Sequence, residues 1–305
     1  MSQSSTEVTR QKEQEPGTGG NFKTSVGARH GWDRFFTALV FAATLIGLAV
    51  LGVLLVDVGR QGVPVLSWHF FTSLGSADAE NAGFLPAILG SLWLLGIVLI
   101  VAVPVGIAAA VYLEEYANDN WLNRLIEINI SNLAGVPSII YGLLGLGVFV
   151  YIFGLGRSIL TGGLILSLLI LPVIIIATRE AVRAVPQSVR EGAYALGATQ
   201  WEAIRYHVLP QALPGALTGT ILALSRAIGE TAPLIAIGAV PYMTFLPEGL
   251  LSSFTAMPIQ IYNWTGEPEE AFQNLAAAGI VVLMLVLLVS NAGAIWLRNK
   301  FQRRN

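Results

Sequence analysis

Six long apolar stretches, separated by polar segments, dominate the hydropathy pattern of this chain. A helix that crosses the hydrocarbon core of a bilayer needs roughly 20 predominantly apolar residues. The pattern therefore predicts an all-α polytopic membrane protein with six transmembrane helices. The predicted spans cover residues 35–56, 84–113, 128–153, 159–177, 214–240 and 273–297.

Composition supports a lipid environment. Of the 305 residues, 54% are apolar and 12% are charged, whereas a soluble domain carries about 25% charged residues. Cysteine is absent, which excludes disulfides and thiolate metal sites. Residues 1–34 are polar and lack apolar periodicity, so we expect them to form a disordered cytoplasmic tail. Residues 298–305 are expected to form a short basic cytoplasmic tail.

The distribution of Lys and Arg predicts the orientation of the spans. Most of the 17 basic residues fall in segments that are cytoplasmic if both termini lie inside, whereas the outer loops contain only Arg60 and Arg157. Basic residues mark cytoplasmic loops. We therefore expect both termini in the cytoplasm of a bacterial cell, with residues 35–83 forming the first span and a periplasmic loop in the inner membrane.

The cytoplasmic segment at residues 179–213 predicts a pair of amphipathic helices. Pro186 suits a first helical turn, and Ser188 followed by Glu191 has the spacing of a capping box. Gly197 is placed to end this helix in a left-handed conformation.

A second helix is expected directly after that turn. Thr199 and Glu202 have capping-box spacing, and Pro210 and Pro214 are expected to limit the helix. Taken alone, such a helix pair is compatible with a plain connector between spans.

Arg226 and Glu230 are the charged residues that fall inside the predicted spans. Charge inside a membrane is costly and usually functional. The two residues are four apart on the fifth predicted helix, with Arg226 near its middle, so they share one face. Either they form an internal ion pair, or Arg226 presents paired donors to an anion while Glu230 orients the guanidinium. Arg179, at the inner mouth of the fourth span, is a weaker candidate for contact with the same anion, and as an arginine that flanks a span it is equally compatible with a role in topology and lipid headgroup contact.

Other chemistry is not expected. The three histidines are scattered and lack ligand spacing, so no metal site is predicted. Glu114 and Glu115 end the second span, and adjacent helical residues point to different faces, so we interpret them as a solvated loop start. No G-x-x-x-x-G-K-[ST] loop occurs. We therefore expect neither catalytic residues nor a nucleic-acid partner for this chain.

The segment at residues 179–213 also carries a family motif. Glu191, Gly192 and Ala193, followed by Gly197 and by the Leu-Pro pair that ends at Pro210, resemble the E-A-A…G…I-x-L-P signature of ABC-importer permeases. Gly192 replaces an alanine of the commonest form, and His207 replaces its isoleucine. The resemblance implies a type I ABC-importer (MetI-like) core at residues 84–297. In that family this loop docks on an ATPase subunit that binds ATP and Mg.

Three further runs resemble phosphate ABC permeases of the PstA type: SRAIGETAPL at 225–234, MPIQIYNW at 257–264 and LAAAGI at 275–280. This resemblance implies a pathway for inorganic phosphate that contains Arg226, Glu230 and Thr231, whereas spacing alone implies only an anion. It also implies a PstC-like second permease, a dimer of PstB-like ATPases and a PstS-like binding protein. A sulfate or molybdate permease and an ATP-independent transporter remain alternatives.

Overall fold

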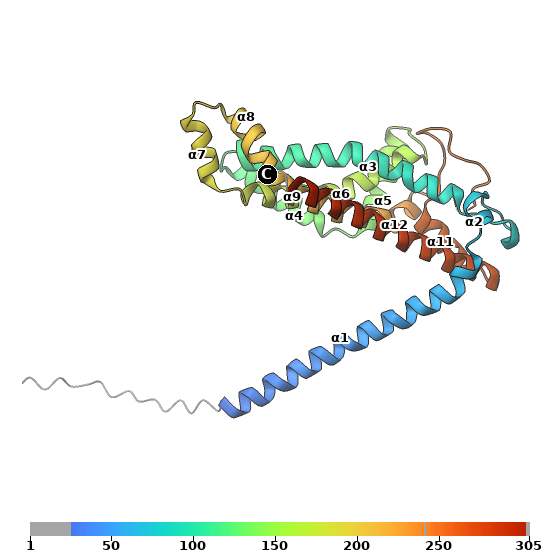
Figure 1. The fold of residues 1–305 in the computed structure, drawn as a ribbon. Helices are drawn as coiled ribbons and strands as arrows, with labels where there is room; N and C mark the ends of the chain where they lie inside the picture. The colour runs from blue at the N-terminus through green and yellow to red at the C-terminus, as the bar shows by residue number, and fades with distance from the viewer. Residues whose placement is uncertain (1–25, 241, 303–305) are drawn as a thin grey trace, which may run out of the picture. The chain divides into compact units, whose positions relative to one another are not determined.

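The computed structural model describes residues 26–240 and 242–302, which divide into one unit ending at Leu54 and another starting at Leu55. Helix α1 (Val26–Gly62) makes up the described part of the first unit and carries the first candidate span (Figure 1). The predicted tail at residues 1–34 is therefore wrong for residues 26–34, which are helical. Once a long helix is nucleated, extending it by a few turns costs little. Residues 1–25 lie outside the described part.

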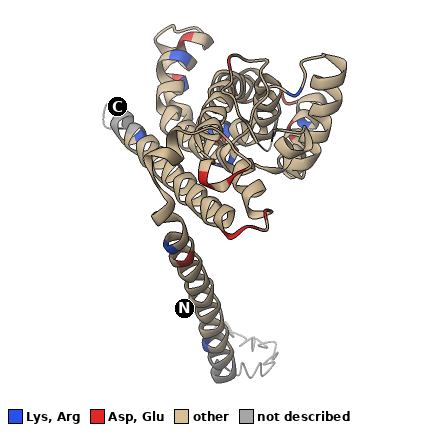
Figure 2. Ribbon diagram, turned by 90° about the vertical axis from the view of Figure 1, so that its right-hand side faces the viewer, with Lys and Arg blue, Asp and Glu red and all other residues tan. Residues whose placement is uncertain are grey.

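The second unit is a bundle of long helices, with α3 (Leu85–Val111), α6 (Ile159–Arg183), α9 (Leu209–Gly229) and α12 (Glu270–Gln302) as its main members (Figure 1). Few charged residues lie along these helices (Figure 2). Across both units, the described residues contain five helices long and apolar enough to cross a membrane, and six spans if one bent pair is counted. The all-α membrane fold is confirmed.

The third predicted span is broken. Helix α4 (Trp121–Ala134) and the following α5 (Ser138–Gly145), which continues as a π-helix, η4 (Leu146–Ile152), meet at a bend of 104°. Pro137 has no N–H to donate and disfavours the helical conformation of the residue before it. The span predicted over residues 128–153 is therefore built from two helices that meet at a bend, and not from one continuous helix.

The fifth predicted span, residues 214–240, ends earlier than expected. Helix α9 stops at Gly229, Glu230 is extended with ψ 123°, and a separate short helix, α10 (Ala232–Ala236), follows. Gly229 is a poor helix former, and Pro233 cannot donate to the carbonyl of Gly229. Arg226 consequently lies in the last turn of its helix and not near the middle of a continuous span.

The same span also begins earlier than predicted. Helix α8 (Gln200–Ala203) continues through a π-helix, η5 (Ile204–Val208), into α9. The expectation that Pro210 and Pro214 limit the helix is wrong. Pro210 lies just after the π-helical turn η5, and Pro214 is accommodated inside α9.

The two ends of the bundle carry different short elements. Helices α7 (Gln187–Ala195) and α8 lie at one end, beside the last turns of α12, while α2 (Trp68–Thr72) and α11 (Met257–Thr265) lie at the other (Figure 1). Residues 298–302, predicted to be tail, belong to α12; residues 303–305 lie outside the described part. The remaining short helices are η1 (Val63–Val65), η2 (Ala79–Asn81) and η3 (Tyr112–Tyr116).

Helices α3, α6 and α9 share one apolar core that includes Val98, Ile170 and Ala227. Small residues bring these helices very close. A Cβ atom added to Gly219 of α9 would lie 2.1 Å from the Cβ of Ala177 of α6, and one added to Gly106 of α3 would lie 2.6 Å from Ile174. The three helices therefore have little room to slide independently.

Candidate functional site

The predicted helix pair exists at one end of the bundle. Gly197 follows α7 with φ 84°, a left-handed conformation that favours glycine. Thr199 and Glu202 form the expected capping box at the start of α8, with Thr199 N donating to Glu202 Oε2 at 2.8 Å. The capping box predicted for Ser188 and Glu191 is wrong, because the chain enters α7 from an N-cap at Pro186 that makes no side-chain bond.

The motif residues of this segment divide between surface and interior. Glu191 and Gly192 are exposed, Ala193 is buried, and Pro210 is half-buried at the start of α9. Leu196, just before the glycine turn, is 90% exposed. This end of the bundle therefore exposes both a carboxylate and a large apolar side chain.

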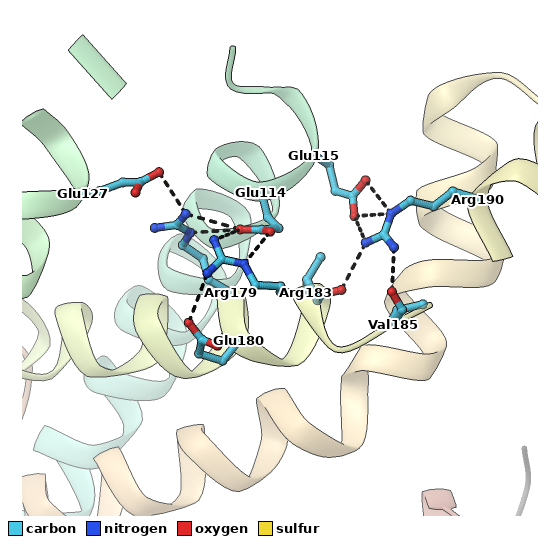
Figure 3. Close-up of polar contacts among 9 residues, drawn as sticks. Glu114, Glu115, Glu127, Arg179, Glu180, Arg183, Val185 and Arg190 are labelled. Atoms are coloured by element: carbon cyan, nitrogen blue, oxygen red, sulfur yellow. Dashed lines mark hydrogen bonds and ion pairs between the residues drawn. The ribbon is translucent and has the colours of Figure 1, made fainter. Parts of the chain in front are cut away.

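Behind the exposed surface, Arg190 ties α7 to two other elements (Figure 3). Its Nη2 lies 2.5 Å from Glu115 Oε1, and its Nε lies 3.1 Å from the same oxygen. Its Nη1 donates to the Val185 carbonyl at 2.8 Å and its Nη2 to the Val182 carbonyl at 3.1 Å. The bonds to Glu115 raise the pKa of Arg190 above its ordinary value, so the guanidinium stays charged.

Glu114 forms a second ion-pair group on the other side of the same turn (Figure 3). Arg183 Nε donates to Glu114 Oε1 at 3.0 Å, and Arg179 Nη2 lies 3.3 Å from Glu114 Oε2. Arg179 also reaches Glu127 at 2.9 Å. These residues line a polar cavity of about 400 Å³.

Two predictions are revised by this geometry. Glu114 and Glu115 are not a solvated loop start, because their side chains are only 15% and 6% exposed and are bound by arginines. They do point in different directions, as adjacent helical residues should. The guanidinium of Arg179 is held by two carboxylates, and its role in a pathway stays a prediction.

Arg226 and Glu230 form the second candidate site. Arg226 Nε donates to Glu230 Oε1 at 3.0 Å, and the two side chains are 46% and 15% exposed. Thr231 lies beside them, with its hydroxyl donating to the Gly229 carbonyl at 3.4 Å. The three predicted pathway residues thus gather where α9 ends and α10 begins.

Helix α5 packs against this break. A Cβ atom added to Gly142 would lie 2.7 Å from the Cα of Pro233, so α5 and α10 are in direct backbone contact. Tyr141, the preceding residue of α5, lies within electrostatic reach of Arg226 and donates to the Leu133 carbonyl at 2.8 Å. Arg226 therefore lies where three helical segments meet.

This arrangement leaves Arg226 able to bind an anion. Within residues 26–240 and 242–302, the hydrogen-bond partner of its guanidinium is Glu230, through Nε alone. The remaining N–H groups form the planar fork that matches carboxylate and phosphate oxygens. The same part of the chain contains no cluster of three or more His, Asp or Glu side chains that could hold a metal ion.

The contacts of Glu114, Glu115, Arg183 and Arg190 are absent from the predictions made on sequence. A signal existed, since acidic residues end the second span and basic residues follow the fourth. Pairing them requires knowing that the ends of α3 and α6 lie side by side, which the sequence pattern does not state.

The chain resembles known transport proteins over most of its length. Residues 102–304 match the family model described as "Binding-protein-dependent transport system inner membrane component". The phosphate transport system permease protein PstA of Haemophilus influenzae is 31% identical over 88% of this chain and 96% of its own length. The probable ABC transporter permease protein YqgI of Bacillus subtilis is 31% identical over 85% and 90%.

Solved structures agree on the fold. A bacterial alginate ABC transporter, in complex with an alginate-bound periplasmic protein, has a chain that is 16% identical and covers 87% of this chain and 93% of its own, with a TM-score of 0.64. The methionine ABC transporter MetNI gives a TM-score of 0.57 at 18% identity, over 70% of this chain and 94% of its own. The predicted resemblance to PstA-type permeases is confirmed, and the chain belongs to the family of binding-protein-dependent transport system inner membrane components.

Proposed function

We propose that this chain is one permease subunit of an ATP-driven importer of inorganic phosphate. Its similarity to PstA permeases from several bacteria, at 31–35% identity over 85–88% of the chain, carries the proposal. The chain forms half of the translocation pathway, and a PstC-like permease forms the other half. A PstS-like protein delivers phosphate from outside.

Arg226 supplies the chemistry for the anion. Its half-exposed guanidinium offers paired donors to phosphate oxygens. Glu230 holds one edge of the guanidinium and competes with the anion, which weakens binding enough for release. A site that binds its ion too well does not conduct.

The end of the bundle that carries α7 and α8 faces the cytoplasm in this proposal. The loops assigned to that side carry most of the basic residues, as cytoplasmic loops do. Arg298 of α12 donates to Thr218 of α9 at 3.4 Å, so the carboxyl-terminal end of the described chain lies near the same end. Both termini are then cytoplasmic, in the inner membrane.

Energy comes from a partner. A PstB-like ATPase dimer binds ATP and Mg, and it contacts the exposed surface around Glu191 and Leu196. The chain itself catalyses no reaction. Its task is to convert movement of α7 and α8 into alternating access of the Arg226 site.

Competition between oxyanions in proteoliposomes tests this function. The four-protein complex is reconstituted with ATP inside, and uptake of labelled phosphate is measured with excess unlabelled phosphate, sulfate or molybdate outside. Unlabelled phosphate should suppress uptake, and the other two anions should not. Equal or stronger suppression by sulfate or molybdate would reassign the substrate, and uptake without ATP would remove the importer class.

A further inference from the structure

One buried guanidinium joins three elements at the α7 end of the bundle. Arg190 belongs to α7, Glu115 to the turn η3 that ends α3, and the two carbonyls that Arg190 binds belong to residues 182 and 185 at the end of α6. Gln200 adds a fourth link, because its side-chain Nε2 donates to the Glu115 carbonyl at 2.6 Å. The Arg190–Glu115 pair thus joins the α7–α8 segment to the ends of two spans, together with the Gln200 bond and the packing of Val189 against the apolar cluster that includes Val182 and Val185.

These bonds are shielded from water. The side chains of Arg190 and Glu115 are 11% and 6% exposed. Arg190 also donates to the Val182 carbonyl, in the last turn of α6, and to the Val185 carbonyl, just beyond the C-cap of that helix. A charged pair with this many partners holds one geometry, because removing either side chain would leave the other charge shielded from water and without its partner.

We propose that Arg190 and Glu115 are a positioning pair that transmits movement of α7 to α3 and α6, and through them to the Arg226 site. The proposal rests on the function proposed above. It goes beyond that function because it assigns the transmission of movement from α7 to two side chains, Arg190 and Glu115, that are not part of the Glu191–Pro210 motif.

The route inward is made of close contacts. Helix α6 packs closely against α9 where Ala177 meets Gly219. Ala177 precedes the residues whose carbonyls Arg190 binds by five positions (Val182) and eight positions (Val185). Helix α9 then leads through Ala223 and Ala227, both in the shared core, to the turn of Arg226. A displacement of α7 therefore reaches the pathway without passing through a mobile segment.

Neighbouring charges differ from this pair. Arg183 is 56% exposed and shares Glu114 with Arg179, while Glu180 is 65% exposed and pairs with Arg183, three residues away on the same helix. Exposed pairs of this kind contribute little to structure. Glu180→Gln is consequently a matched control, since it removes a carboxylate charge at the same end of the bundle without touching the pair.

Transport coupling is the first test. Glu115→Gln, Arg190→Gln, the double variant and Glu180→Gln are each reconstituted in the full complex, and phosphate uptake is divided by ATP hydrolysed. We expect each single variant to lower this ratio by roughly three- to thirty-fold, the double variant to lower it no further, and Glu180→Gln to leave it unchanged. Losses that multiply in the double variant, or singles that match Glu180→Gln, overturn the proposal.

If the substituted complexes do not assemble, the distance between two spin labels tests the proposal in the complex that keeps Arg190 and Glu115. The chain has no cysteine, so spin labels can be placed through Tyr116→Cys beside the pair and Leu196→Cys at the exposed tip. In the otherwise unsubstituted complex, the label separation should stay constant when ATP is added, because η3 and α7 move together. A separation that changes overturns the proposal.

Failure of the proposed function would look different. A complex with the unsubstituted chain that shows no phosphate-stimulated ATP hydrolysis contradicts the importer itself. Normal stimulation together with unchanged ratios in all the variants contradicts only the positioning pair.

Discussion

Two arginines of the second unit differ in how their charge is held. Arg190 is 11% exposed and binds a carboxylate and two backbone carbonyls. Arg226 is 46% exposed and binds one carboxylate through Nε. Both lie next to a helix end, and both have a glutamate partner. The difference lies in the number of bonds and in access to solvent.

The comparison indicates that the charge of Arg190 has a structural role, whereas the charge of Arg226 can exchange one binding partner for another. A buried ion pair is costly to form and more costly to break, so it fixes the elements that carry it. A half-exposed arginine that is bonded through Nε alone has N–H donors that can take an anion as a further partner. This difference is why we assign transmission of movement to the α7 end of the bundle and anion binding to the α9–α10 break in the proposals above.

The largest expected effect belongs to Arg226→Gln, which removes the exchangeable charge. Loss of a charged hydrogen-bond partner costs about 2–5 kcal/mol, so uptake should fall more than about thirty-fold while the complex still assembles. Arg226→Lys keeps the charge but loses the planar fork, and should give intermediate uptake. Uptake of labelled phosphate is the measurement, and normal uptake by Arg226→Gln would remove Arg226 from the pathway.

Glu191→Arg should have the next largest effect, on assembly. Glu191 is exposed on α7 within the motif, so a bulky residue of opposite charge should displace the ATPase while membrane insertion is retained. Copurification of the ATPase with tagged permease measures this. Gln187→Arg is the matched control, since Gln187 is exposed on the same helix but lies outside the motif. Equal ATPase recovery from both variants would contradict a docking role for Glu191.

Gly142→Ala tests whether the α5–α10 contact positions the anion site. The added methyl would lie 2.7 Å from the Cα of Pro233, so α10 must shift away from α5. Overpacking of this kind costs about 1–3 kcal/mol, and uptake should fall several-fold. Gly147→Ala adds the same methyl where no atom lies within 4 Å, and should transport normally. Thermal unfolding of both variants shows how much of any loss is structural.

Thr199→Ala should have the smallest effect. It removes the capping box that starts α8, which costs about 0.5–2 kcal/mol of local stability. Amide hydrogen exchange at residues 200–203 should accelerate, with uptake per ATP only slightly reduced. Thr199→Ser keeps the hydroxyl and should exchange like the unsubstituted chain. Equal acceleration in Thr199→Ser would show that the cap is not responsible.

The local features of the fold were accessible from sequence. Hydropathy gave the existence of each span, because burial in lipid demands a long apolar run. The glycine turn at Gly197 and the Thr199–Glu202 box were correct because both depend on residues a few positions apart. The break at Pro137 was missed, since spans tolerate prolines and the sequence alone does not distinguish a tolerated proline from a bend of 104°.

In the candidate site, too, contacts between residues close in sequence could be predicted, whereas contacts between distant residues could not. Arg226 and Glu230 are four residues apart, so helical spacing predicts their pairing, and the pair forms although the helix ends at Gly229. Arg190 and Glu115 are separated by 75 residues, and their contact depends on how α3 and α6 pack. No local pattern encodes such a contact.

Phosphate uptake by this chain with and without its partners tests the central claim most directly. The purified chain alone, the two permeases together, and the complete complex with ATP are reconstituted into separate liposomes, and accumulation of labelled phosphate is compared. The proposed function predicts accumulation in the complete complex with ATP and none in the other two preparations. Accumulation by the chain alone, without an ATPase, would contradict it.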